Sequence, residues 1–234
     1  MNSKIQERPR KVGQQETLNL EKLNEAINNR LHVINQEFTD GLNFVKKHSK
    51  SVTFFGSART LDNEYYYIKA RELAYKICKE INYAIITGGG PGIMEAGNRG
   101  ACEAGGDSLG LTIKLPMEQV TNPYLTEHMD FNYFFSRKVS MSFSAEAYVY
   151  FPGGFGTLDE FFEILTLIQT EKVEPTPIIL FGKKYWGALD KYIKKHLLKG
   201  EKIDAKDRDL YVITEDLDEI VEIIKNAPVR TEVN

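Results

Sequence analysis

The sequence predicts a Rossmann-like α/β fold, in which a doubly wound and mostly parallel sheet is covered by helices on both faces. Two observations carry this prediction. Short runs of β-branched and aromatic residues alternate with amphipathic helical segments along most of the chain. Several of these runs end in glycine-rich turns, and in open parallel sheets the ligand lies at the carboxyl ends of the strands. With 234 residues, the chain is most simply one domain with an N-terminal helical extension.

The N-terminal part divides into an arm and a helix. Residues 1–16 are polar and unpatterned, so we expect a mobile arm. Over residues 17–48, apolar residues recur at steps of three and four, which predicts an amphipathic helix that covers the sheet or a partner subunit. Asp40 and Gly41 suggest an interruption in this helix. A Rossmann-like domain is expected over residues 49–228.

The remaining elements follow from apolar periodicity. Helices are expected at residues 63–81, after the glycines at 88–92, from residue 136, over 161–168, along one face of 186–197 and at 216–226. Strands are expected at residues 51–55, 83–87, 109–113, 131–134, 147–151, 177–181 and 210–213.

The turn at residues 152–160, with the sequence PGGFGTLDE, follows one predicted strand and opens a helix. Its three glycines let a ligand approach the backbone without a Cβ in the way. Thr157 and Asp159 are expected to cap the helix, whose free N–H groups would cradle a phosphate. Glu160 is expected in the first turn, beside whatever the N–H groups hold. Tight packing of a helix on a sheet is the alternative explanation, but generic turns of this kind seldom need three glycines.

Composition excludes several classes of function. A net charge of −3 gives no basic field for nucleic acid or an anionic membrane. No apolar run reaches a membrane span, and no signal peptide is apparent, so we expect a cytoplasmic protein. Cys78 and Cys102 are expected to be core residues in a reducing compartment. The four histidines form no metal-binding pattern, so no structural or catalytic metal is expected.

The common nucleotide motifs do not match. A dinucleotide fingerprint fails because its third glycine would fall at Ile93 or Glu95, and Gly182-Lys183 lacks the upstream glycine of a P-loop. Pyridoxal chemistry is disfavoured because no histidine is followed by lysine, as in decarboxylases of that class.

The motif at 152–160 resembles the PGGxGTxxE signature of the LONELY GUY family of cytokinin-activating phosphoribohydrolases, which are often mislabelled as lysine decarboxylases. Residues 88–96, 55–59 and 136–138 resemble further blocks of that family, in the same order. The resemblance covers about residues 50–225. It implies hydrolysis of the N-glycosidic bond of a nucleoside 5′-monophosphate, AMP or a cytokinin riboside 5′-monophosphate, in an active site shared across a homodimer.

The resemblance also implies roles for individual residues. Arg137 and Glu160 would be the catalytic pair. A carboxylate near the ribose would stabilise the positive charge of the transition state, and an arginine fork would orient it or bind phosphate. A non-catalytic nucleotide-binding or signalling protein is the alternative. The remaining residues would bind the substrate: Gly153, Gly154, Gly156 and Thr157 at the phosphate, and Lys138, Thr166, Ser57, Gly90 and Glu95 around the nucleotide.

Overall fold

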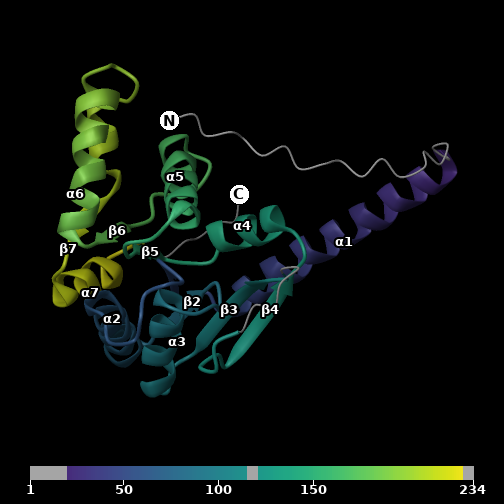
Figure 1. The fold of residues 1–234 in the computed structure, drawn as a ribbon, viewed down its shortest axis with the longest axis horizontal. Helices are drawn as coiled ribbons and strands as arrows, with labels where there is room; N and C mark the ends of the chain where they lie inside the picture. The colour runs from purple at the N-terminus through teal and green to yellow at the C-terminus, as the bar shows by residue number, and fades with distance from the viewer. Residues whose placement is uncertain (1–19, 115–120, 229–234) are drawn as a thin grey trace, which may run out of the picture.

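The computed structural model of the chain describes residues 20–114 and 121–228 (Figure 1). The expected arm at residues 1–16 lies outside this part. Within it, the strands form one seven-stranded sheet in the order β4-β3-β2-β1-β5-β6-β7, and every neighbouring pair is parallel. The predicted fold class is therefore confirmed. The strands are β1 Ser51–Phe55, β2 Ala84–Thr87, β3 Ser108–Ile113, β4 Glu127–Phe131, β5 Ala147–Tyr150, β6 Ile178–Phe181 and β7 Val212–Thr214.

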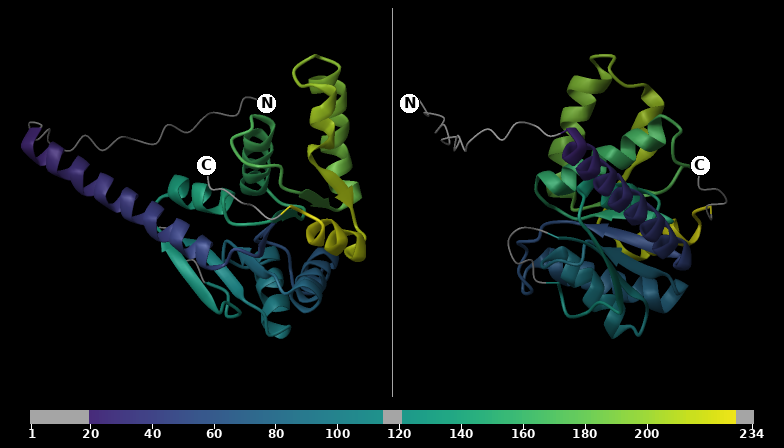
Figure 2. Two further views of the ribbon diagram at one scale, coloured as in Figure 1. Left: turned by 180° about the vertical axis from the view of Figure 1, so that it is seen from behind. Right: turned by 90° about the vertical axis from the view of Figure 1, so that its right-hand side faces the viewer.

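Helices cover both faces of the sheet and create two apolar cores (Figures 1 and 2). One core packs α2, α3 and α7 against one face, and the other packs α1, α4, α5 and α6 against the opposite face. The helices are α1 Leu20–Lys47, α2 Tyr65–Ile81, α3 Ile93–Glu103, α4 Phe134–Ser142, α5 Phe155–Gln169, α6 Lys183–Tyr192 and α7 Leu217–Lys225, with a π-helical turn Ile193–Leu198 and a 3-10 turn Ala205–Leu210. Among the described residues, no helix is long and apolar enough to cross a membrane.

Helix α1 is continuous, so the expected interruption near Asp40 and Gly41 is wrong. Gly41 is a contact point instead of a break. A Cβ at this position would overlap the hydroxyl of Ser140 in α4, so the glycine lets the two helices approach closely. The C-terminal half of α1 packs on α4 and β4. Residues 17–19 of the predicted helical extension lie outside the described part of the chain.

The boundary between β4 and α4 differs from the prediction. The strand expected at residues 131–134 runs over Glu127–Phe131, and the helix begins at Phe134. The first four residues of β4 alternate between half-buried and exposed in this edge strand, and only Phe131 is buried. Its sequence, EHMDF, therefore lacks the apolar run typical of the buried strands. Cys78 is buried as expected, but Cys102 is exposed on the outer side of α3, so the expectation that it is a core residue is wrong.

Glu37 explains why α4 begins where it does. This residue of α1 is 5% exposed, and its carboxylate accepts hydrogen bonds from the backbone N–H groups of Asn132 and Tyr133 at 2.6 and 3.3 Å. The hydroxyl of Ser136 also donates to it. Burial pushes the pKa of Glu37 upward, but these hydrogen bonds outweigh burial and hold the pKa below its ordinary value. The carboxylate thus caps α4, which has no side-chain cap of its own.

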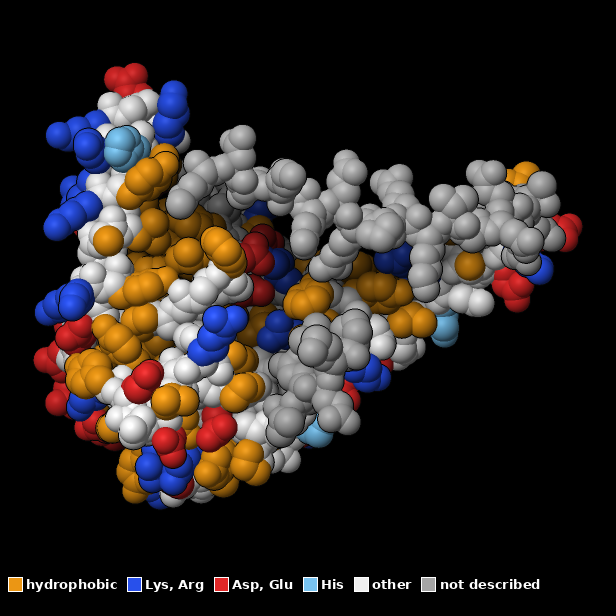
Figure 3. Space-filling model, in the orientation of Figure 1, with side chains coloured by type: hydrophobic (Ala, Val, Ile, Leu, Met, Phe, Trp, Pro, Cys, Tyr) orange, Lys and Arg blue, Asp and Glu red, His pale blue; other side chains and the backbone are white. Residues whose placement is uncertain are grey.

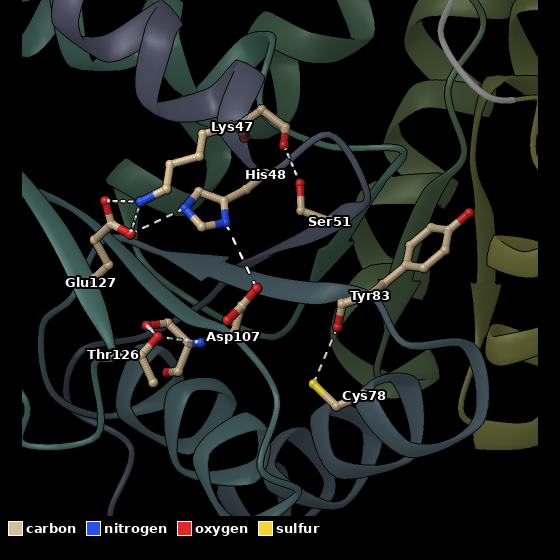
Figure 4. A network of polar contacts seen from close by, with 10 residues as sticks. Lys47, His48, Ser51, Cys78, Tyr83, Asp107, Thr126 and Glu127 are labelled. Carbon is tan, nitrogen blue, oxygen red and sulfur yellow. Dashed lines mark hydrogen bonds and ion pairs between the residues drawn. The ribbon is translucent and has the colours of Figure 1, made fainter.

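A polar network lies at the amino-terminal ends of the strands (Figure 4). Lys47 Nζ lies 2.7 Å from Glu127 Oε2. His48 lies between two acids, with Nε2 3.4 Å from Glu127 Oε2 and Nδ1 3.8 Å from Asp107 Oδ2. These contacts join the end of α1 to Asp107, just before β3, and to Glu127, the first residue of β4. The glycine-rich turns lie at the opposite, carboxyl-terminal ends of the strands.

Candidate active site

A cavity of about 900 Å³ opens at the carboxyl ends of β1 and β5, where the strand order reverses. Its position agrees with the expected ligand site of an open parallel sheet. The turn after β1 is tied to the turn after β5 by a hydrogen bond from Ser57 N–H to Pro152 O at 3.0 Å. The turn before α3 joins them because Ile93 N–H donates to Ser57 O at 3.0 Å. Three turns therefore form the walls of one cavity.

The start of α5 carries unsatisfied backbone donors. The helix begins at Phe155 with Gly154 as its N-cap, and no side chain caps it. The expected capping by Thr157 and Asp159 is therefore wrong, because both residues lie inside the helix. Leu158 N–H makes the first helical bond, to Gly154 O at 3.1 Å, so the preceding N–H groups have no helical acceptor. Such a helix start binds anions, and this one lines the cavity.

The three glycines of this turn differ in how much space a side chain would have at each position. A Cβ on Gly153 would overlap Thr157 Oγ1 and lie 3.1 Å from the carbonyl carbon of Gly56, so the fold itself needs glycine there. A Cβ on Gly154 or Gly156 would meet nothing within 4 Å, and neither residue has a positive φ. The fold does not require these two glycines. Both line the cavity, so the room that they leave is available to a ligand.

Glu160 lies in the second turn of α5, because the helix starts earlier than its apolar periodicity indicates. The expectation that it falls in the first turn is wrong. Its side chain is 13% exposed and lines the cavity, and its Oε2 atom is buried without a hydrogen-bond partner among the described residues. Burial raises the pKa of Glu160 to about 7, against the lowering effects of Lys138 and Arg137. A buried carboxylate oxygen without a hydrogen-bond donor is costly, and such groups gather at functional sites.

Lys138 of α4 is shared among three acids of α5. Its Nζ atom lies 2.7 Å from Asp159 Oδ2, an ion pair without the geometry of a hydrogen bond. The same atom lies 3.7 Å from Glu163 and 3.9 Å from Glu160. Asp159 therefore holds the ammonium group closer than the buried Glu160 does. Figure 3 shows acidic and basic side chains gathered in a hollow in the middle of this face.

We expect Asp159→Asn to lower the pKa of Glu160 from its value of about 7. The substitution removes a neighbouring negative charge and frees Lys138 to approach Glu160, and both changes favour the carboxylate. The measurement is a pH titration of carbon-13-labelled glutamate side chains by NMR, with the Glu160 signal assigned from its absence in Glu160→Gln. An unchanged or higher pKa in Asp159→Asn would contradict this description of the ion pairs.

Arg137 lies in the same turn of α4 and is held by backbone atoms. Its Nε atom donates to the carbonyl oxygen of Leu111 in β3 at 2.6 Å. A Cβ on Gly88 would overlap Arg137 Nη2, so the guanidinium group occupies the space that this glycine leaves. Burial lowers the pKa of Arg137, whereas Glu160 raises it. The Nε side of the guanidinium group is therefore fixed on β3. Arg137 lines the same cavity as Glu160.

The structure brings most of the predicted site residues together. The cavity is lined by Gly153, Gly154, Gly156, Thr157, Ser57, Arg137 and Glu160. Lys138 does not line it, but its Nζ atom lies 3.9 Å from Glu160 Oε2.

Three predicted substrate-binding residues lie elsewhere. Glu95 accepts a hydrogen bond from Tyr67 at 2.9 Å, on the side of α3 that faces α2. Gly90 O accepts from the side chain of Asn122 at 3.1 Å. Thr166 is exposed on the outer side of α5 and donates to Phe162 O at 2.6 Å. Like Lys138, none of the three lines the 900 Å³ cavity. The catalytic and substrate-binding roles of all the predicted site residues stay predictions.

Two contributors to the site are not predicted from the sequence. Gly88 belongs to a predicted glycine-rich turn, but only the structure shows that its missing side chain makes room for Arg137. Glu37 positions α4, and with it Arg137 and Lys138. The signal for Glu37 was available, because an acid three residues after Ile34 and one before Phe38 lies beside the apolar stripe of its helix.

Comparison with known proteins identifies the family. The family model described as "Possible lysine decarboxylase" matches residues 94–224. Cytokinin riboside 5′-monophosphate phosphoribohydrolase LOG5 of Arabidopsis thaliana is 25% identical over 182 residues, which are 77% of this chain and 79% of that protein. The enzyme of the same name from Rhodococcoides fascians is 25% identical over 76% of this chain and 90% of its own length.

Solved structures support the fold. A structural genomics target is 25% identical with a TM-score of 0.55, over 75% of this chain and 98% of its own. The molybdenum cofactor carrier protein of Chlamydomonas reinhardtii is 21% identical with a TM-score of 0.57, over 76% and 97% of the two chains. Because the family model spans more than half of the sequence, this protein belongs to the family described as possible lysine decarboxylases, the LONELY GUY family.

Proposed function

We propose that this protein hydrolyses the N-glycosidic bond of a nucleoside 5′-monophosphate, AMP or a cytokinin riboside 5′-monophosphate, to the free base and ribose 5-phosphate. The observation that carries the proposal is the buried Glu160 carboxyl group, which has an oxygen without a hydrogen-bond partner and lines the same cavity as an uncapped helix start. The cavity volume of about 900 Å³ lies within the range of small-molecule sites. The names of the relatives support the same reaction.

The reaction needs a group that favours the transition state over the bound substrate. As the bond between C1′ and the base nitrogen breaks, its electron pair leaves with the base, which gains a proton. Positive charge develops on the ribose, and water adds to C1′ and loses a proton. A carboxylate beside the ribose stabilises that charge, which the substrate lacks. Glu160 supplies this carboxylate, Arg137 donates to phosphate or base, and the N–H groups at the start of α5 hold the 5′-phosphate. No step calls for a metal or a cofactor.

The alternative is a protein that binds a nucleotide without cleaving it. The uncapped start of α5 suits both functions, because it needs only an anion. Glu160 favours the enzyme: a carboxylate in the cavity repels a phosphate dianion, and burying its Oε2 atom without a hydrogen-bond donor destabilises the fold. Binding alone gives no reason for such a residue. Release of base from nucleoside monophosphates separates the two functions.

We expect Gly154→Val to abolish stabilisation by AMP while leaving the protein folded. The new side chain has free space in the fold but occupies the approach to the helix start. Loss of a glycine N-cap costs at most about 1 kcal/mol of stability. The measurement is the AMP-induced shift in Tm. Gly187→Val in α6, where a Cβ also meets nothing within 4 Å, is the matched control and should keep the full shift. A normal shift in Gly154→Val would remove this turn from the phosphate site.

A further inference from the structure

The N-terminal half of α1 carries an apolar stripe that the described part of the chain leaves uncovered. Leu20, Leu23, Ile27 and Leu31 are 69%, 40%, 46% and 51% exposed. Figures 1 and 2 show this half of the helix extending away from the sheet and from the other helices. An uncovered stripe of this length is unusual on a monomer and marks an interaction surface.

The stripe continues a face that already serves for packing. At 100° per residue, it lies on the same side of the helix as Phe38, Gly41 and Val45. These three residues pack against the body of the protein: Phe38 contacts Phe135, Gly41 contacts α4, and Val45 belongs to a core. A partner that covers the stripe in the N-terminal half of α1 therefore lies on the same side of the helix as α4.

The spacing of the stripe is symmetric about Ile27. Leu23 and Leu31 lie four residues before and after it, and Leu20 and Ile34 lie seven residues before and after it. Two such helices in antiparallel orientation would place Ile27 opposite Ile27, Leu23 opposite Leu31, and Leu20 opposite Ile34. A surface that matches itself in this way is what a twofold symmetric interface requires.

We propose that α1 pairs in antiparallel orientation with α1 of a second copy of this chain, with the twofold axis at Ile27. Charges permit this register: Arg30, which flanks the stripe, would face Asn24 of the second copy. Residues 1–19 offer no matching stripe, since Ile5, Val12 and Leu18 stand among polar residues and Pro9. Glu21 and Glu25 on the far side of the helix disfavour an anionic membrane.

The pairing extends onto the rim of the cavity. The stripe from Leu20 to Ile34 is about 21 Å long at 1.5 Å per residue, which makes a small interface on its own. Leu20 of the second copy would reach past Ile34 toward Phe134 and Phe135, which are 61% and 44% exposed at the start of α4. Phe134 also lines the cavity. The second copy thus adds an apolar wall beside the site, and we expect the pair to form at micromolar concentration.

Disulfide trapping tests the register directly. In a Cys102→Ser background, which removes the exposed native thiol, Ile27→Cys should cross-link to itself under mild oxidation at micromolar concentration. Leu23→Cys and Leu31→Cys, carried on copies with tags of different mass, should cross-link to each other faster than either does to itself. Asn29→Cys, on the opposite side of α1, is the matched control and should stay uncross-linked.

A second measurement checks the apolar contact. Ile27→Glu should shift the protein toward smaller species in light scattering, whereas Asn29→Glu should not. The proposal is wrong if Ile27→Cys stays uncross-linked, or if Leu23→Cys pairs with itself as readily as with Leu31→Cys, which would indicate parallel helices. It is also wrong if Ile27→Glu leaves both the mass and the Leu23–Leu31 cross-link unchanged. Neither readout uses catalytic activity, so failure here leaves the proposed reaction untouched.

Discussion

Glu160→Gln is expected to reduce kcat for AMP hydrolysis by about 10² to 10³, with a much smaller change in binding. The carboxylate opposes charge that develops only as the glycosidic bond breaks, so its loss affects the transition state more than the bound substrate. The measurement is kcat and KM with AMP. Glu163→Gln, one turn further along α5 and 39% exposed, is the matched control and should keep near-parental kcat.

Stability gives the same substitution a second readout. The folded-state pKa of Glu160 is about 7 against an ordinary value of 4.5, so the folded protein binds the proton more tightly than the unfolded chain. Stability from the protonated carboxyl is fully present below pH 4.5 and is lost as pH rises through 7. Glutamine stays neutral, so Glu160→Gln should be more stable than the parent at pH 8, by roughly 1–3 kcal/mol, and gain little near pH 4.

A structural role for Glu160 makes the opposite predictions. If Glu160 mainly supported its helix, glutamine would lower the stability at pH 8 and leave kcat near the parental value. Lower Tm together with normal turnover would therefore contradict the proposed mechanism.

Arg137→Lys should lower kcat/KM for AMP by about 10²-fold, although it keeps the positive charge. Lysine has neither the Nε donor that binds Leu111 O nor the planar fork above Gly88. Its ammonium group would have no comparable support in the cavity. Steady-state kinetics with AMP provide the measurement.

The matched control replaces an arginine whose guanidinium group makes two hydrogen bonds outside the site. Arg71 of α2 contacts Glu103 through Nε and Nη2 at 2.6 and 2.7 Å, so Arg71→Lys loses a similar pair of bonds on the surface. It should keep parental kinetics. Equal kinetics in Arg137→Lys and the parent would show that only the charge of Arg137 matters.

The fold was predictable because each buried strand has a local signature. The strands β1, β2, β5 and β6 are fully buried, so their sequences are short apolar runs that end at glycine or proline. Edge strand β4 is only partly buried, and because most of its residues are polar, its position was not predicted correctly from the sequence. The continuity of α1 at Gly41 depends on a contact with α4, and a sequence pattern does not contain such tertiary contacts.

The site was predictable where the backbone dictates its shape. The glycines at 153, 154 and 156, together with Glu160, lie within one turn and the helix that follows it, so local sequence places them correctly. Glu95 follows a similar glycine-rich turn, yet its side chain points to Tyr67. The direction of the Glu95 side chain depends on the rotation of α3 about its axis, and the packing of α2 on α3 sets that rotation. Glu37 lies far from α4 in sequence, and only the folded protein brings them together.

The most direct test of the proposed function is incubation of the pure protein with a panel of nucleoside 5′-monophosphates and the matching nucleosides, followed by chromatography. We predict equal amounts of free base and ribose 5-phosphate from at least one monophosphate, no release from its nucleoside, and loss of release in Glu160→Gln. Stabilisation by AMP without release of base from any monophosphate would contradict hydrolysis and indicate a nucleotide-binding protein.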